Sequence, residues 1–227
     1  MRTSEEFSKY LESYLLQTKG PEGLHFLMAK AEAKRLNKEG ISISRVEGEM
    51  LSFFIRLLGC RKFVEIGTLT GYSALCILKG MDVAGELWTF EKDPAHAASA
   101  RSILAEAIRL PENSTMKYHL LEGDAETKLA EIEDEGPFDG IFIDGNKSSY
   151  GIYLDWATKN LKKGGLIICD NVFLSGSVLG MNSDQGSKFS AKQVGVVREV
   201  NARLLTTDQF MGVLVPTSEG LAVAVKL

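Results

Sequence analysis

The stretch "KFVEIGTLTGYSALC", residues 62–76, contains the pattern that decides the fold. An apolar run at 62–66 is followed by the glycine-bounded segment Gly67–Gly71 and then by a helix-like segment that starts near Tyr72. A short buried strand that leads through a glycine loop into a helix is the repeating unit of sheets whose strands alternate with helices. The fold class therefore depends on whether this alternation continues along the chain.

The alternation of strands and helices continues to about residue 205 and is followed by a C-terminal hairpin. Four more short apolar runs are separated by segments with helical spacing: "ELWTFE" (86–91), "KYHLLEG" (117–123), "GIFID" (140–144) and "LIICDN" (166–171). A helix near 193–205 then precedes two runs that the turn "PTSEG" joins as a hairpin, "FMGVLV" (210–215) and "LAVAVKL" (221–227). We predict an α/β fold with a doubly wound, mostly parallel seven-stranded sheet and an antiparallel C-terminal strand.

Residues 1–59 have the spacing of amphipathic helices rather than strands. Thr3 with Glu6, and Ser44 with Glu47, have the spacing of capping boxes that begin helices, and a further helical stretch runs from about 22 to 37. We expect one domain over 1–227, with a helical layer or lid at 1–59 and the sheet core at 60–227. The first helix should be amphipathic, with an apolar face made of Phe7, Tyr10, Leu11, Tyr14 and Leu15.

The composition is that of an ordinary globular protein. The chain has 227 residues, of which 44% are hydrophobic and 25% charged, and a net charge of -4 that argues against a nucleic-acid partner. No apolar run is long enough to span a membrane, and the N-terminus lacks the pattern of a signal peptide, so we expect a cytoplasmic protein. Three scattered cysteines agree with that location, and we expect them to be small core residues: Cys60, Cys76 and Cys169.

Two acids end the first two predicted strands. Ligands of parallel sheets bind beyond the carboxyl ends of the strands, which is where Glu65 and Glu91 should lie. Glu91 suits a ribose diol, and Glu65 beside Gly67–Gly71 would attract an ammonium group and repel a diphosphate. The loop also lacks the central glycine of a dinucleotide fingerprint, so S-adenosylmethionine (SAM) fits better than NAD. The alternative is that the glycines only form a tight turn and Glu65 is solvated.

Oxygen-bearing side chains follow two later strands. Asp144 ends one predicted strand, and Asp170 with Asn171 ends another, so all three should meet at one sheet edge. Two carboxylates and a carboxamide suit Mg²⁺ best, with Mn²⁺ or Ca²⁺ also possible, and lack the histidine and cysteine that zinc prefers. Lys147 lies three residues past Asp144, where it could act as a general base or only as an ion-pair partner. Asp170 and Asn171 could instead only cap the turn after the strand.

Several motifs in a fixed order give the chain a family resemblance. It resembles the cation-dependent class I SAM O-methyltransferases, the group that contains catechol and caffeoyl-coenzyme A O-methyltransferases. The resemblance covers about residues 38–227 and implies a Rossmann-like methyltransferase fold. Its motifs are "ISISRVEGEML", "VEIGTLTGYSAL", "LWTFEKDP", "LLEGDAETKL", "FIDGNKSSY", "LKKGGLIICDNVFLSGSV" and "VPTSEGLAVAVKL".

The resemblance implies roles for individual residues. Asp144, Asp170 and Asn171 match the family's metal ligands, and Lys147 matches the lysine assigned as base in the catechol enzymes. It implies methyl transfer to a hydroxyl of a catechol or caffeoyl-type vicinal diphenol, with Asp144 and Lys147 as the catalytic residues. The residues that match the cofactor site are Ser42, Glu65, Gly67, Ser73, Glu91, Gly123, Asp124, Ala125 and Asp144.

The chain departs from the plant-type members of this family at two places. Where they have Asp-Ala-Asp-Lys this chain has "DGNK" at 144–147, so we expect a less negative site. The segment 172–192, which lines the acceptor pocket in the family, contains a polar stretch at 181–192 that we expect to form a surface loop. The sequence therefore does not identify the methyl acceptor.

Other classes of function explain fewer residues. A nucleotide-dependent dehydrogenase would use Gly67 and Glu91 but leave the later acids without a role, and a nucleic-acid amino-methyltransferase would need a motif that "IDGNK" is not. A non-catalytic SAM-binding protein would not need the metal ligands or the lysine. The resemblance also implies a homodimer, with the helical layer acting partly as a lid and partly as the contact between subunits.

Overall fold

The computed structural model describes residues 5–82, 84–111, 115–180 and 188–227. Its sheet has seven strands in the order β3-β2-β1-β4-β5-β7-β6. β1 to β5 run parallel to one another, and β7 pairs antiparallel with both β5 and β6. The predicted sheet, including its antiparallel C-terminal strand, is confirmed. The strands are β1 (Lys62–Ile66), β2 (Glu86–Glu91), β3 (Lys117–Glu122), β4 (Phe138–Ile143), β5 (Leu161–Cys169), β6 (Phe210–Val215) and β7 (Leu221–Lys226).

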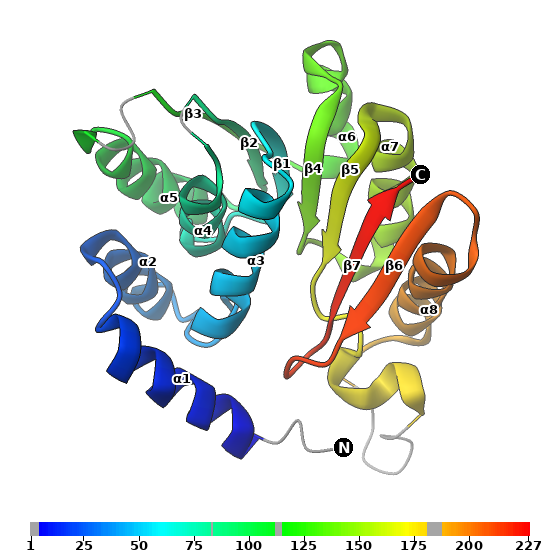
Figure 1. Cartoon of the computed structure of the whole chain (residues 1–227), viewed down its shortest axis with the longest axis horizontal. Coiled ribbons are helices and arrows are strands. Elements are labelled where there is room, and N and C mark those ends of the chain that lie inside the picture. Colours follow the sequence, from blue (N-terminus) through cyan, green and yellow to red (C-terminus); the bar gives the residue numbers. More distant parts are fainter. Residues whose placement is uncertain (1–4, 83, 112–114, 181–187) are drawn as a thin grey trace.

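Helices cover both faces of the sheet (Figure 1). One apolar core lies under α6, α7 and α8, and the other lies under α3, α4 and α5. The central strands are apolar on both sides because both of their faces are covered. The helices are α1 (Glu5–Lys19), α2 (Leu24–Arg35), α3 (Arg45–Leu57), α4 (Tyr72–Gly80), α5 (Pro94–Ala107), α6 (Ala125–Lys128), α7 (Tyr150–Asn160) and α8 (Ala191–Thr206).

The helical layer forms mostly as predicted. The capping box of Ser44 and Glu47 is present at the start of α3, whereas the proposed interaction of Thr3 with Glu6 lies outside the described residues. α2 ends at Arg35, two residues before the predicted end, and Asn37 has a left-handed φ of 58°. α1 packs on α3, and α2 packs on α5 and α4, so this layer lies beside the first half of the sheet (Figure 1).

Several strand boundaries differ from the prediction, and β4 begins at Phe138 rather than at 140. β5 begins at Leu161 rather than 166, because Phe138 pairs with Leu161 before the register shifts and resumes with Gly140 opposite Leu166. The exposed "KKG" that follows Leu161 was expected to lie outside the strand. β4 and β5 also end one residue before Asp144 and Asp170, so these side chains lie on the loops that leave the sheet edge.

Smaller predictions can also be compared with the structure. All three cysteines are buried and free, as expected for core residues. Within the described ranges no helix is both long and apolar enough to cross a membrane. Most of the expected loop at 181–192 falls at residues 181–187, outside the described part of the chain, and α8 begins at Ala191.

Candidate active site

A cavity of about 370 Å³ opens at the carboxyl edge of the parallel strands. Its wall is formed by the loops after β1, β2, β3, β4 and β5 together with the segment Ile41–Ile43 that leads into α3. Of the predicted cofactor residues, eight line this cavity and Glu65 lies buried beneath its first loop. The eight are Ser42, Gly67, Ser73, Glu91, Gly123, Asp124, Ala125 and Asp144.

The glycine loop brings two strand ends into contact. Gly67 has a φ of +97°, and a Cβ at this position would lie 2.3 Å from the backbone oxygen of Asp144. The backbone N–H of Asp144 donates to the Ile66 oxygen at 2.9 Å, which joins β1 and β4 at this edge. Only glycine fits both the dihedral angle and the space, so the Asp144 loop can lie directly against the first loop.

Glu65 is fully buried under the glycine loop. Its Oε2 accepts a hydrogen bond of 2.5 Å from the Thr89 hydroxyl, while Oε1 has no hydrogen-bond partner among the described residues. Burial raises the pKa of Glu65 to about 7, against the lowering effect of the Ser73 and Thr89 hydroxyls. An unsatisfied carboxylate oxygen in a dry site is costly unless a donor pairs with it, so this position suits a cationic donor such as an ammonium group. The alternative of a solvated Glu65 is wrong.

Glu91 has a different environment. One of its carboxylate oxygens accepts from the Leu69 N–H at 2.8 Å and the other from the Asp93 N–H at 2.9 Å. These bonds fix the carboxylate between the glycine loop and the start of α5. Each oxygen retains a second lone pair, so Glu91 can still accept from vicinal hydroxyls of a ligand in the cavity.

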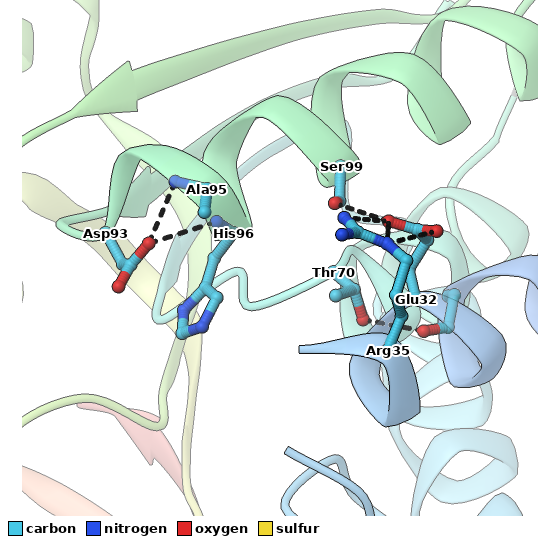
Figure 2. Close-up of polar contacts among 8 residues, drawn as sticks. Glu32, Arg35, Thr70, Asp93, Ala95, His96 and Ser99 are labelled. Atoms are coloured by element: carbon cyan, nitrogen blue, oxygen red, sulfur yellow. Dashed lines mark hydrogen bonds and ion pairs between the residues drawn. The ribbon is translucent and has the colours of Figure 1, made fainter. Parts of the chain in front are cut away.

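Figure 2 shows how this region is held against the helical layer. The Thr70 hydroxyl of the glycine loop donates to the Ala29 oxygen of α2 at 2.8 Å. Glu32 of α2 accepts from the Ser99 hydroxyl of α5 at 2.8 Å and from Arg35. The Asp93 carboxylate caps α5 by accepting from the N–H groups of Ala95 and His96. The glycine loop is thus fixed from the layer outside the sheet as well as from β1.

The second group of predicted residues lies after β4 and β5. Lys147 Nζ donates to Asp144 Oδ1 at 2.8 Å, and its side chain is 12% exposed. Asp170 Oδ1 accepts from the Asn171 N–H at 2.7 Å, and Oδ2 accepts from Asn171 Nδ2 at 3.1 Å, which leaves the Asn171 amide oxygen for another partner. Asn171 adopts a φ of 55°, a strained conformation that often marks a functional position.

The negative charges of Asp144 and Asp170 are only partly balanced by the positive charge of Lys147. Burial raises the pKa of Asp144, and the Lys147 ammonium lowers it only in part. Burial and the neighbouring carboxylates of Asp144 and Glu47 raise the pKa of Asp170 well above its usual range. Throughout the described segments no three histidine, cysteine, aspartate or glutamate side chains converge as a ready metal site. The predicted set needs only two such residues, with the Asn171 amide as its third ligand.

A second cavity of about 470 Å³ adjoins the first. The two share Ile41–Ile43 and Asn171 in their walls, and Asp170 lines the second cavity only. The loop after β5 therefore lies between two spaces. One is bounded by the glycine loop, and the other is bounded by the helical layer and Glu219.

Sequence reasoning did not single out several residues of these walls. The aromatic side chains of Tyr72, Phe90 and Tyr153 line the first cavity, and their patterns indicated only helix and strand core. Glu47 lines the second cavity, although its spacing from Ser44 indicated only a capping box. Helical and strand periodicity identifies a buried face but not the cavity that the face borders.

The model of a protein family described as O-methyltransferase matches residues 19–227 of this chain. A relative from Niastella koreensis named catechol O-methyltransferase is 32% identical over 221 residues, which is 95% of this chain and 96% of the relative. Another of that name, from Mycobacterium tuberculosis, is 31% identical and covers 82% of this chain and 80% of its own.

Solved structures are similar over nearly the whole chain. An O-methyltransferase from Bacillus cereus in complex with SAH is 26% identical with a TM-score of 0.82, and the match covers 98% of this chain and 99% of that one. The O-methyltransferase TomG from Streptomyces achromogenes, solved in complex with SAM, is 25% identical with a TM-score of 0.82 and covers 100% of this chain and 99% of its own.

Proposed function

The chain belongs to the O-methyltransferase family and is a SAM-dependent O-methyltransferase, and from this premise we propose that it methylates a vicinal diphenol in a divalent-cation-dependent reaction. The observation that carries the cation dependence is the set of Asp144, Asp170 and Asn171 at one edge of the sheet, where Lys147 is the one basic side chain among the described residues that forms an ion pair with a carboxylate of the set. Support for a catechol or caffeoyl-type acceptor comes from the names of the curated relatives.

We propose that the methyl donor occupies the 370 Å³ cavity. SAM supplies an electrophilic sulfonium methyl group. Glu65 would pair with its ammonium group through the unsatisfied Oε1, with Ser73 beside it. Glu91 would accept from the ribose hydroxyls, and the segment 123–125 would border the adenine. Ser42 closes the wall of this cavity from the helical layer.

The donor atoms present fit a hard divalent cation. The Asp144 carboxylate raises the free energy of the charged form of Asp170, and a cation held by these residues would offset this repulsion. The free amide oxygen of Asn171 would complete a set of three oxygen ligands, which suits Mg²⁺ and is compatible with Mn²⁺ or Ca²⁺. When bound, such a cation supplies Lewis-acid stabilisation of a deprotonated hydroxyl and a fixed orientation for the acceptor.

Lys147 is the candidate base of the reaction. Its ammonium group is held at 2.8 Å from Asp144 and packs over the Tyr150 ring, with Nζ 5.0 Å from the ring centroid. From this position a neutral Lys147 would accept the proton of the acceptor hydroxyl, and Asp144 would hold the resulting ammonium in place. The acceptor itself would enter from the second cavity, because that cavity is lined by Asp170 and Asn171 and adjoins the one assigned to the donor.

Chelation tests this function directly. Transfer from labelled SAM to a panel of catechols and caffeoyl compounds should fall to background with excess chelator and return when Mg²⁺ is added, because the acceptor would no longer be held at the Asp144 edge. SAM binding in chelator, measured by calorimetry, should persist. Transfer that continues unchanged in chelator would contradict the cation dependence.

We further propose that the helical layer forms a homodimer contact. Its outer surface exposes large apolar side chains on three helices, among them Tyr14, Leu24 and Phe53 at 54%, 68% and 59% exposure. Tyr14 and Phe53 line one cavity of this layer together, and contiguous exposed apolar surface is typical of an interface. Light scattering should give twice the mass of one chain, and a Phe53→Glu variant should be monomeric. A wild-type monomer at micromolar concentration would contradict this proposal.

A further inference from the structure

Glu47 has a function in the helix that contains it. It occupies the third position of α3, where its Oε2 accepts from the Ser44 N–H at 2.8 Å and its own N–H donates to Ser44 Oγ at 3.2 Å. This reciprocal pair satisfies two N–H groups at the helix start. The capping role uses one carboxylate oxygen and requires no charge.

The same chain contains a second capping box, which shows that capping does not require a charged side chain. At the start of α8, Gln193 takes the place of the acid, and its Oε1 accepts from the Ser190 N–H at 2.9 Å. A neutral amide therefore satisfies the same helix geometry in this protein. If capping were the only role of Glu47, its negative charge would be unnecessary.

Glu47 is buried beside residues of the proposed cation site. The residue is 5% exposed, and Oε1 is buried without a hydrogen-bond partner in the described part of the chain. The side chain lines the second cavity together with Asp170 and Asn171, and its charge repels both Asp144 and Asp170. Lys30 and Arg45 line the same cavity, but among the described residues neither forms an ion pair with Glu47, and Lys30 pairs with Glu22 instead. A buried carboxylate beside two others is strongly unfavourable without a counterion.

From this placement we propose that Glu47 is a third carboxylate of the divalent-cation site, acting from the helical layer through its charge and through a bound water. Direct coordination is excluded for this conformation, because no three acidic, histidine or cysteine side chains of the described segments converge on one point. The inference rests on the proposed cation dependence. It also accounts for the unsatisfied Oε1, which would accept a hydrogen bond from water held at the site. Asn146 stands where plant-type members have an acid, so one negative charge is missing from this site. Glu47 would supply part of that negative charge.

The test uses Glu47→Gln in the full-length protein, because glutamine keeps the volume and the capping bond, as Gln193 does. Mn²⁺ binding, measured by electron paramagnetic resonance with SAM present, should weaken by about 10- to 100-fold, which is the usual effect of losing an outer-shell partner of a metal site. In chelator the variant should melt at a temperature equal to or above that of wild type, since a buried charge has been removed. The increase in melting temperature that Mn²⁺ gives the wild type should be reduced.

Ser44→Ala is the matched control. It removes the other half of the capping box and should lower the melting temperature, but it should leave Mn²⁺ affinity unchanged because no charge is lost. If Glu47→Gln binds Mn²⁺ as tightly as wild type, Glu47 is only a cap and the inference is wrong. If wild type itself binds no Mn²⁺, the proposed cation dependence fails, and the inference fails with it. An equal loss of Mn²⁺ affinity in Ser44→Ala and Glu47→Gln would assign the effect to helix structure and would also overturn the inference.

Discussion

Replacing Lys147 with methionine should lower kcat by about a thousandfold, the usual effect of removing a general base. Lys147 is the one lysine that pairs with Asp144 in the described structure, and the variant would remove the group that we propose takes the hydroxyl proton. The binding constant for SAM should stay close to that of wild type, because Lys147 is not among the residues that would hold its charged groups. Steady-state rates and calorimetry on the same preparations measure the two quantities.

A second variant distinguishes the role of Lys147 as a proton acceptor from its role as a positive charge. Lys147→Arg keeps a cation beside Asp144 but cannot accept a proton, because a guanidinium stays protonated in proteins. We expect it to be nearly as inactive as the methionine variant and to lose the dependence of kcat on pH that the base confers. Lys162→Met, which breaks a 2.7 Å ion pair with Asp139 at the opposite end of β4, should keep near wild-type kcat. An arginine variant with wild-type activity would show that Lys147 acts only through its charge.

Glu65→Gln should weaken SAM binding by roughly 30- to 150-fold, which corresponds to about 2–3 kcal/mol for one hydrogen bond between buried charged groups. The same variant should raise the melting temperature of the ligand-free enzyme above pH 7. The reason is that glutamine removes a carboxylate that is fully buried and has an unsatisfied oxygen. Opposite effects on binding and on stability would distinguish a ligand-binding acid from a structural one.

The pH dependence of Glu65 has a definite sign. Burial raises its pKa from 4.5 to about 7, so the folded protein retains a proton that the unfolded chain releases. The stability linked to this group is therefore complete below pH 4.5 and is lost as the pH rises through 7. A bound ammonium favours the carboxylate instead. SAM affinity should accordingly increase by up to about tenfold per unit as the pH rises toward 7 and then level off.

Two comparisons isolate this effect. Glu65→Gln should show a much flatter dependence of SAM affinity on pH over the same range. Glu122→Gln, which removes an exposed acid at the end of β3 that pairs with Arg101, should behave like wild type. A Glu65→Gln enzyme that binds SAM normally, with an unchanged pH profile, would contradict the assignment of Glu65 to the ammonium group.

The sheet could be predicted because its signals are local. Each strand is a short apolar run that is followed by glycine or an acid, and buried parallel strands have that composition in nearly any context. Strand ends were less predictable. Leu161 belongs to β5 because it pairs with Phe138, and a pairing between distant segments leaves no periodic signal in "LKKGG". The end of β4 before Asp144 is likewise set by the register with its neighbours.

The sequence by itself determined which residues reach the carboxyl edge of the sheet. Strand direction and the side chain at each strand end are local properties, so Glu65, Glu91, Asp144 and Asp170 could be placed there without coordinates. Only the tertiary structure decided how these groups affect one another. The burial that raises the pKa of Glu65 arises where the glycine loop covers β1, and the closeness of Glu47 in α3 to Asp144 and Asp170 arises where the helical layer packs beside the sheet. Desolvation and charge interactions depend on distances through space, which the order of residues along the chain does not contain.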